Sequence, residues 1–566
     1  MSHAGRHSER ARFAESKGAG NLMANSAAVA SDHVGAVATD KHPKGLYVLF
    51  ATEMWERFSF YSMLALFTLY LQDPNDGFGW TAERATTLYS WYLAFVYASP
   101  LVGGFIADRK LGYRRSVMIG GFFFMAGHLL LAFPTVTAVY AALTCLVIGN
   151  GFFKPNVSTM VGNLYPEGSH LKDRAYNIFY MGINIGAFIA PIVAEFVKQQ
   201  FGVHPAFAVA AGGMVISVAI LWFFKSTVKE ADERAAAVKR QQAADAAAVT
   251  VDAPPSEASQ QKGGNAIDRV PDWKRVVALV VIFIIVIVFW MAFHQNGSTL
   301  TYWADDNTAW DVSGTISNAI NPFWIISLTF PLVWFWKWLD GKGKEPSTPT
   351  KMAMGMFLTA LSFFILYLAA KSGEAQTPTA DQLASGDFRV TERSLENLQA
   401  QGLPADVIER LKAKDDKGKY VVLDRKYSKS EDGTATGQQG LQAGLAAALG
   451  PDAGRHGPAI TQQAYLFRVS PFWLILAYAV ISLGELMLSP MGLSLVSKVA
   501  PIRMRGLLMG GWFVATAIGN KLTAIGVYWS YWKQSSFFII LGGMAFVMAI
   551  VLLILLRPLK KAMPGV

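Results

Sequence analysis

Long apolar stretches recur along almost the whole chain, and shorter polar segments separate them. Many of these stretches reach the ~20 residues that an α-helix needs to cross the hydrocarbon core of a bilayer. The pattern predicts an all-α polytopic membrane protein. Its twelve predicted transmembrane helices lie at residues 44–71, 83–107, 115–133, 138–163, 172–199, 205–225, 274–304, 312–338, 350–371, 467–499, 504–530 and 536–557.

Three polar segments fall outside this pattern. Residues 1–43 lack the apolar core of a signal peptide and are expected to form a disordered cytoplasmic tail. Residues 226–271 read as a cytoplasmic linker between an N-terminal bundle (44–225) and a C-terminal bundle (272–371 and 466–558). Residues 372–465 form an insert between the ninth and tenth helices. We expect a small tethered or partly ordered unit there, with helix within 393–414 and a strand at 420–423.

The composition agrees with a membrane protein. Of 566 residues, 52% are hydrophobic and 16% charged, whereas soluble domains have about 25% charged residues. The net charge of +10 would suit nucleic acid, but the basic residues lie mostly in loops between apolar stretches. That distribution favours contact with membrane lipid and no nucleic-acid partner.

Basic residues also predict the orientation. One alternate set of short loops and the C-terminal tail contain most of them, whereas the other set holds only Arg84, Lys198 and Lys533. By the positive-inside rule, both termini are cytoplasmic and the 372–465 insert is extracytoplasmic.

The two halves share one loop pattern. Residues 104–115 follow the second predicted helix and residues 340–344 follow the eighth, and both combine an acidic residue, glycines and basic residues. Such a loop by itself is also compatible with a tight basic turn. Together with six helices on each side of the linker, it resembles the major facilitator superfamily, in which two six-helix bundles face each other across a cavity.

The first predicted helix carries charges in its apolar middle. Glu53, Glu56, Arg57 and Tyr61 are spaced three or four residues apart, so they share one face. Each charge costs about 2.5–3.5 kcal/mol at the membrane centre, which indicates a site for ions, protons or a charged solute. The alternative is a self-neutralising pair that only stabilises the bundle, but it leaves one carboxylate without a cation.

Two further charges lie in other predicted helices. Lys154, beside Pro155 in the fourth helix, is a cation that could meet the spare carboxylate. Glu485 in the tenth helix has no charged neighbour along the chain, so it needs a partner from another helix or a proton.

Other polar residues leave two interpretations open. Tyr180 and Asn184 share a face and serve either contacts between helices or ligand binding. His294 is either a packed core histidine or a titrating group. No metal-ligand spacing, nucleophile–base pair or nucleotide loop stands in the sequence. These observations argue against an enzyme and predict no cofactor.

Together these motifs resemble the proton-coupled oligopeptide transporter (POT) family of the major facilitator superfamily. The resemblance rests on Glu53, Glu56, Arg57 and Phe58, and on the stretches 152–156, 179–186 and 485–490. It implies a proton-coupled symporter that imports di- and tripeptides across the bacterial inner membrane by alternating access. It also implies protons as the coupling ion, and we expect a monomer.

The resemblance assigns roles to individual residues. Proton coupling falls to Glu53, Glu56, Arg57, Lys154 and Glu485. The residues expected to bind substrate are Arg57, Tyr61, Tyr97, Lys154, Tyr180, Asn184, His294, Gln295, Asn321, Glu485 and Ser489.

The chain also departs from the family pattern. Leu64 stands where many members have a second arginine, and His294 where many have glutamate. The 226–271 segment is too polar for the extra helix pair of many bacterial members, and the large insert is similar to that of animal members. The same fold with another small solute, such as nitrate, a drug or a peptidomimetic, stays an alternative. A receptor without transport and a membrane enzyme are further ones.

Overall fold

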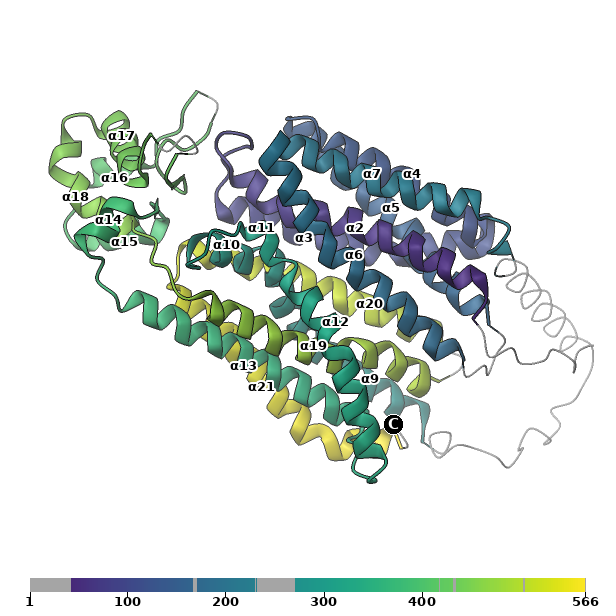
Figure 1. Ribbon diagram of the computed structural model, residues 1–566. Helices are drawn as coiled ribbons and strands as arrows, with labels where there is room; N and C mark the ends of the chain where they lie inside the picture. Colours follow the sequence, from purple (N-terminus) through teal and green to yellow (C-terminus); the bar gives the residue numbers. More distant parts are fainter. Residues whose placement is uncertain are drawn as a thin grey trace, which may run out of the picture. The chain divides into compact units, whose positions relative to one another are not determined.

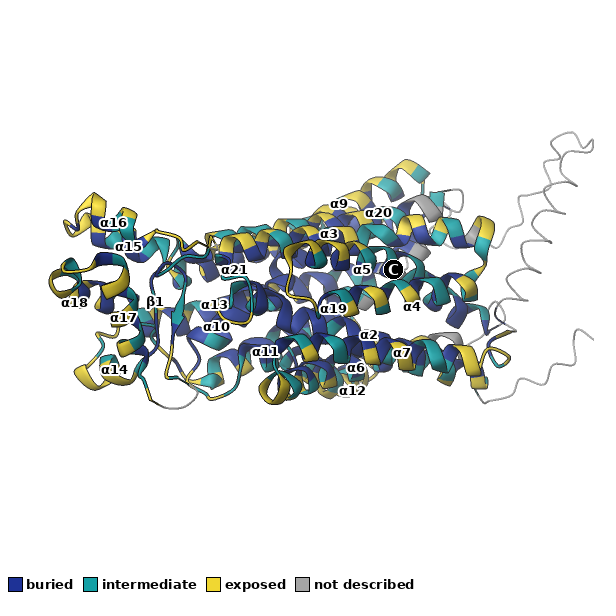
Figure 2. Ribbon diagram, turned by 90° about the horizontal axis from the view of Figure 1, so that it is seen from above, coloured by how far each residue is buried: buried dark blue, intermediate teal, exposed yellow. Residues whose placement is uncertain are grey.

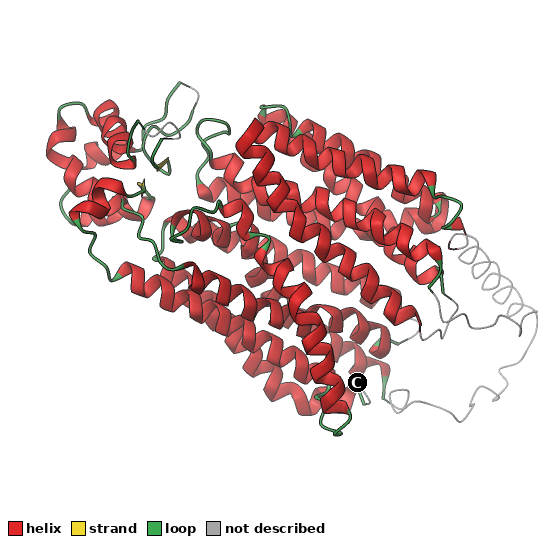
Figure 3. Cartoon of the chain, viewed as in Figure 1, coloured by secondary structure: helices red, strands yellow, loops and turns green. Residues whose placement is uncertain are grey.

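The computed structural model describes residues 42–165, 171–229, 231, 270–416, 418–430, 434–501 and 504–564. The predicted tail at 1–43 and the predicted linker at 226–271 lie largely outside these residues. The prediction that the linker contains no extra helix pair therefore concerns residues outside the described chain. The described chain is mainly helical (Figure 1; Figure 3).

Six long helices make up the first half of the described chain. α5 contacts both α3 and α4, and α4 and α6 both contact α7. A core that includes the fully buried Phe124, Phe153 and Phe207 runs through these helices. The bounds agree with the prediction to within three residues at nearly every end: α2 (Lys44–Gln72), α3 (Ala82–Ile106), α4 (Tyr113–Leu130), α5 (Val136–Asn163), α6 (Leu171–Phe201) and α7 (Val203–Phe223).

The second half has a core of its own, with Phe289, Trp303, Phe363 and Phe538 among its buried residues. α13 packs against both α19 and α21, and α9 packs against α20. The long α-helices of this half are α9 (Asp272–Phe293), α12 (Ile320–Asp340), α13 (Thr348–Glu374), α19 (Pro471–Val499), α20 (Arg505–Leu522) and α21 (Gln534–Ala562).

Three predicted helices of this half are interrupted, so the prediction of continuous helices was wrong there. A 3₁₀ segment, η4 (His294–Gly297), separates α9 from α10 (Thr299–Asp306), and α20 continues as the 3₁₀ segment η6 (Thr523–Ser530). The short α11 (Gly314–Ser317) precedes α12. The backbone at η4 lies close to α3, since a Cβ on Gly297 would lie 2.1 Å from the Tyr89 hydroxyl. Apolar periodicity does not reveal such contacts.

Nine helices of the described chain are long and apolar enough to cross a membrane. The protein is therefore a multi-pass membrane protein. Figure 2 shows buried residues along the long helices and exposed residues on the insert helices α16 (Ala405–Leu411) and α18 (Asp452–Ala464).

The insert is a folded helical unit. Phe388, Leu395, Leu411, Leu441 and Ile460 form its apolar core. Its two strands pair antiparallel, with Phe388 opposite Tyr427. The remaining elements are α14 (Ala380–Ser385), β1 (Phe388–Arg389), α15 (Glu392–Ala400), β2 (Lys426–Tyr427) and α17 (Gly437–Leu449).

The expected helix within 393–414 exists as two helices, α15 and α16. Gly402, at φ +94°, and Pro404 lie in the turn that separates them. The strand expected at 420–423 is misplaced, because the strand of this region is β2, at Lys426–Tyr427. Tyr420 and Leu423 make only isolated bridges, to Lys414 and Val390.

The two halves contact each other near the insert. The Thr68 hydroxyl donates to the Gly297 carbonyl at 3.1 Å, and the hydroxyls of Thr86 and Tyr302 lie 3.3 Å apart. The Tyr531 hydroxyl donates to Glu83 Oε2 at 3.1 Å. These bonds join the ends of α2 and α3 to α10 and the α20–α21 region, so the two halves are closed against each other at this end.

Candidate functional site

The charged face of α2 is buried and internally paired. Glu53 and Glu56 have no exposed surface, and Arg57 is 5% exposed. Arg57 Nη2 donates to Glu56 Oε1 at 2.5 Å, and its Nε donates to Glu56 Oε2. Arg57 Nε lies 3.5 Å from Glu53 Oε1. The Arg57 guanidinium thus forms a bidentate pair with Glu56 and only a single, longer contact with Glu53. Two parallel N–H···O bonds are stronger than one longer contact.

The second cation of this network comes from α5. Lys154 Nζ donates to Glu53 Oε1, which confirms that a cation from another helix meets the spare carboxylate. α5 approaches α3 very closely at two glycines. A Cβ added to Gly103 would lie only 1.9 Å from the Gly151 carbonyl oxygen. Glu53 Oε2 stays buried without a hydrogen-bond partner among the described residues. Two carboxylates and two cations therefore form one neutral network, which is buried except for the Lys154 side chain, 30% of which is exposed.

Glu485 of α19 lies in the other half with a different kind of partner. It is buried, and Asn321 Nδ2 of α12 donates to its Oε2 at 3.1 Å. The same amide nitrogen donates to the Ser482 hydroxyl at 2.9 Å. Within the described chain, no lysine or arginine nitrogen lies within 4.0 Å of this carboxylate. Its side-chain partner among the described residues is thus an amide rather than a cation.

Tyr180 and Asn184 of α6 lie between the halves. Tyr180 packs against an apolar cluster from α12 and α19 that includes Ile325, Trp336 and Met487. The Asn184 amide donates to the Tyr180 carbonyl at 2.9 Å. Tyr180 therefore reaches from the first half of the chain to the helix that carries Glu485.

His294 is packed among aromatic rings. It stacks on Trp290 with 5.4 Å between ring centroids and meets Tyr97 edge-on at 5.6 Å. Its Nε2 is buried without a hydrogen-bond partner among the described residues. This environment is that of a packed histidine, one of the two interpretations left open by the sequence.

The side-chain amide of Gln295 is hydrogen-bonded to neighbouring residues of the protein. Its Nε2 donates to the carbonyls of Met291, at 3.3 Å, and Thr523, at 3.1 Å. Its Oε1 accepts from the Thr299 hydroxyl at 2.7 Å. In this conformation Gln295 joins the break in the α9–α10 segment to η6.

The predicted site residues thus fall into two groups. Glu53, Glu56, Arg57 and Lys154 form the network of the first half, and Asn321 and Glu485 pair in the second. Tyr61 follows Arg57 by one turn and contacts Phe60 edge-on at 5.2 Å. Ser489 is partly buried one turn after Glu485. Sequence reasoning missed Ser482, although its position three residues before Glu485 places both on one face.

Asn321 lines a small pocket with Asn296 and Tyr478, whose hydroxyl donates to Asn296 Oδ1. A larger pocket lies at the insert end, away from both charged groups.

A model of the POT family matches residues 114–244, 235–392 and 441–540, which together exceed half of the chain. The chain belongs to the POT family. The resemblance seen in the sequence is thereby confirmed, and the protein is a transporter rather than an enzyme. The matched residues include Lys154, Asn321 and Glu485.

Relatives of this POT family member match over nearly its whole length. The di-/tripeptide transporter of Lactococcus lactis subsp. lactis is 28% identical over 549 residues, which cover 93% of this chain and 97% of the relative. An uncharacterized transporter of Bacillus subtilis is 27% identical over 567 residues, covering 93% and 96%. The crystal structure of a mutant peptide transporter POT in complex with alafosfalin has a TM-score of 0.65 at 27% identity, and the match covers 93% of this chain and 97% of that one.

Proposed function

We propose that this protein is a proton-coupled symporter that imports di- and tripeptides across the bacterial inner membrane by alternating access. Twelve helices in two six-helix bundles of the major facilitator type, with both termini cytoplasmic, form the transporter. It acts as a monomer in the lipid bilayer and uses protons, without another cofactor. The ion-pair network of Glu53, Glu56, Arg57 and Lys154 in one half, with the buried Glu485 in the other, is the observation that carries this proposal.

The charges suit the two ends of a short peptide. A zwitterionic peptide needs a cation for its carboxylate and an anion for its amine. Arg57 and Lys154 supply the cations from α2 and α5, and Glu485 supplies the anion from α19. Hydroxyl and amide groups of Tyr61, Tyr97, Tyr180, Asn184 and Ser489 bind the peptide backbone, which permits many side chains. The similarity to the di-/tripeptide transporter of Lactococcus lactis and to a peptide transporter crystallised with alafosfalin supports this substrate class.

Proton coupling follows from the pairing in the network. With both carboxylates ionised, Glu53 holds Lys154 and Glu56 holds Arg57. A proton from the outer side neutralises one carboxylate and releases its cation to the peptide carboxylate. The halves then rearrange, the site faces the cytoplasm, and the ion pair reforms when the proton leaves. The closed contacts at the insert end fit a conformation that is shut toward the outside.

The test uses Glu56→Gln and Lys154→Ala in proteoliposomes. We expect both variants to keep exchange of labelled dipeptide for unlabelled dipeptide, since exchange needs no net proton movement. Accumulation driven by an imposed pH gradient should fall to the background of empty vesicles. Lys198→Ala is the matched control, because Lys198 pairs with Glu195 at 3.5 Å near the end of α6. Undiminished accumulation in both site variants would refute the coupling role.

Competition separates peptides from other solutes. Uptake of labelled dialanine should be inhibited by trialanine and should be insensitive to alanine, nitrate and unrelated drugs. Inhibition by nitrate alone would favour the alternative substrate.

A further inference from the structure

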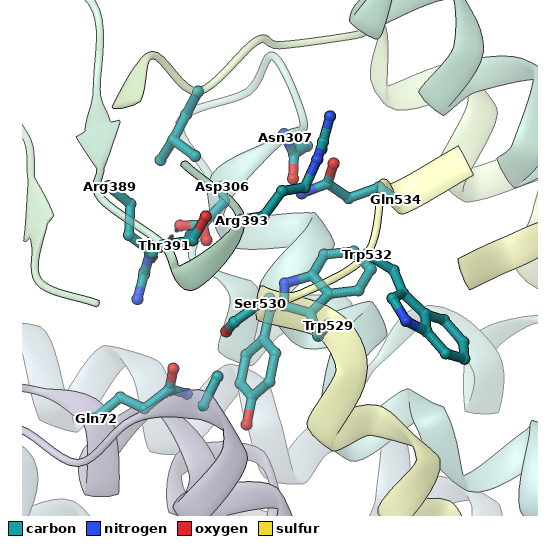
Figure 4. A pocket seen from close by; sticks show the side chains of 13 residues that line it. Gln72, Asp306, Asn307, Arg389, Thr391, Arg393, Trp529, Ser530, Trp532 and Gln534 are labelled. Carbon is teal, nitrogen blue, oxygen red and sulfur yellow. Dashed lines mark hydrogen bonds and ion pairs between the residues drawn. The ribbon is translucent and has the colours of Figure 1, made fainter. Parts of the chain in front are cut away.

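A pocket lies between the insert and the ends of the membrane helices (Figure 4). Its walls come from the insert, from the end of α10, from the η6–α21 turn and from the ends of α2 and α3. The enclosed space is about 40 Å³, room for a few water molecules or one carboxylate group, and it opens to solvent. None of the residues assigned to the central site lines it.

Two arginines of the insert present unused donors to this pocket. Arg389 donates through Nη1 to the Asp424 carbonyl at 3.0 Å and through Nη2 to Asp306 Oδ1 at 3.1 Å. Its Nε is buried without a partner among the described residues. Arg393 makes no ion pair within 4.0 Å in the described chain, and Figure 4 shows its side chain beside the pocket together with Asn307 and Gln534.

Two carboxylates near these arginines, those of Asp306 and Glu374, are already engaged, whereas Asp424 beside Arg389 keeps a buried Oδ1 without a hydrogen-bond partner among the described residues. Asp306 accepts from Arg389 and also lies 3.3 Å from Lys426 Nζ. Glu374, whose charge acts on Arg393, accepts from the backbone N–H of Ser535 at 3.0 Å and from its hydroxyl at 2.5 Å. Burial lowers the pKa of Arg393 from its ordinary value, but a guanidinium keeps its proton in proteins. Arg393 is a partly buried cation without a paired anion in the described chain, and such a group favours an anion from solution.

The remaining walls suit a peptide end. The Oδ1 of Asn307 is buried and has no partner in the described part of the chain, so it is available to a ligand N–H. Trp529 and Trp532 supply apolar surface, and the Gln534 amide lies at the same pocket. Donors for an anion, one acceptor and an aromatic wall therefore meet in one place.

We propose that this pocket is an outer binding subsite for a carboxylate, and that it holds the C-terminal carboxylate of an incoming peptide before the outer side opens. The identity of the carboxylate rests on the proposed function. Arg393 and Arg389 Nε bind the carboxylate, and Asn307 accepts from the peptide N–H. The floor of the pocket includes Tyr302, whose hydroxyl meets Thr86 across the closed outer contact.

The test measures protection of a thiol placed in the pocket. Cys145 is the single cysteine, so Cys145→Ala with Gln534→Cys gives one reactive site in the full-length chain. The reagent is a membrane-impermeant maleimide, applied to proteoliposomes. We expect dialanine to slow labelling at least threefold and dialanine amide to leave the rate unchanged. Adding Arg393→Gln should abolish the protection, whereas the control Arg455→Gln, on the exposed face of α18, should keep it.

The assay distinguishes this subsite from the central one. Lys154→Ala should keep the protection, because the proposed contact does not involve the central network. The inference is overturned if dialanine protects the thiol from labelling equally well with and without Arg393→Gln. It is also overturned if acetate protects the thiol and dialanine does not. If Gln534→Cys does not fold, Ser530→Cys, a nearly isosteric change in the same pocket, replaces it. Protection of the thiol requires binding but no transport. Failure of the proposed function would therefore appear in the uptake assays, and failure of the subsite would appear in the labelling assay.

Discussion

If Glu485 binds the substrate amine as proposed, its pairing with Asn321 shows how one neutral side chain prepares a membrane carboxylate for a ligand. The amide fixes one carboxylate oxygen without neutralising its charge. A lysine or arginine in the same place would compete with the peptide amine, whereas an amide orients the group and leaves its charge for the substrate.

We expect Asn321→Ala to raise the KM for dipeptides by roughly tenfold or more. A hydrogen bond to a charged group contributes about 1.5–3 kcal/mol, and about 1.4 kcal/mol corresponds to a factor of ten. Initial rates of dialanine uptake over a range of concentrations measure the effect. Asn318→Ala is the control, since Asn318 donates to the Thr301 hydroxyl at 3.2 Å and not to Glu485. An unchanged KM in Asn321→Ala would mean that Glu485 needs no orientation by this amide.

Asp424 makes the insert sensitive to pH. Burial raises its pKa to about 7, and the nearby Arg389 offsets only part of this effect. In the unfolded chain the pKa is about 3.9. The folded insert therefore favours the protonated form, so its stability is greatest below pH 4 and falls as the pH rises from about 4 to about 7. The difference reaches at most about 4 kcal/mol.

Asp424→Asn should remove this pH dependence. Asparagine also tolerates the φ of +55° at this position. The melting temperature of each protein at pH 5 and pH 8 provides the measurement, and the wild type should lose more stability between them than the variant does. Asp381→Asn, at an exposed position of α14, should behave as the wild type. Identical pH profiles for wild type and Asp424→Asn would contradict the assignment.

At the scale of elements, the crossing of α3 and α5 depends on glycine. Gly103→Ala would place a Cβ 1.9 Å from the Gly151 carbonyl oxygen, so the helices must separate. We expect a loss of several degrees in melting temperature and reduced uptake, because α5 carries Lys154. Gly104→Ala is a close control, since its nearest neighbour would be 3.7 Å away. Equal stability of the two variants would show that the crossing tolerates a methyl group.

The helix spans were predictable because the length of an apolar stretch is a local property of the sequence. The interruptions of the helices were not predictable, because they depend on residues far away along the chain. The break at His294–Gly297 depends on Tyr89 and Thr523, which lie far away along the chain. The same distinction holds in the site. The charged face of α2 follows from spacing, and the pairing of Lys154 with Glu53 follows from charge balance. The choice of Asn321 for Glu485 follows only from packing between helices.

At the scale of the whole described chain from residue 45 onward, the insert contacts both halves. Lys426 Nζ lies 2.6 Å from Asp305 Oδ2 at the end of α10. On the other side, Lys419 Nζ donates to the carbonyls of Pro74, at 2.7 Å, and Gly77, at 3.0 Å, in the α2–α3 loop. The contacts of Lys419 must break if the halves separate on the outer side.

A disulfide tests this requirement. A Cβ on Gly79 would lie 3.4 Å from the Cβ of Lys419, close to the spacing of about 3.5–4.5 Å in disulfides. In a Cys145→Ala background, Gly79→Cys with Lys419→Cys should lose uptake on oxidation and regain it with dithiothreitol. Each single substitution should transport under both conditions. Full uptake by the oxidised double variant would show that the insert and the loop need not separate.

On the proposed mechanism, the charges of the four-residue network and of Glu485 together have an electrical consequence for the transport cycle. With Glu485 ionised, three carboxylates outnumber the two cations by one, so the empty carrier holds one negative charge. One bound proton cancels it, and a zwitterionic peptide adds none. A voltage across the membrane then acts on the return of the unloaded carrier, with about 2.3 kcal/mol per 100 mV for a full crossing. The inward step with cargo is electrically silent, so the current recorded during peptide uptake reports how fast the empty protein resets.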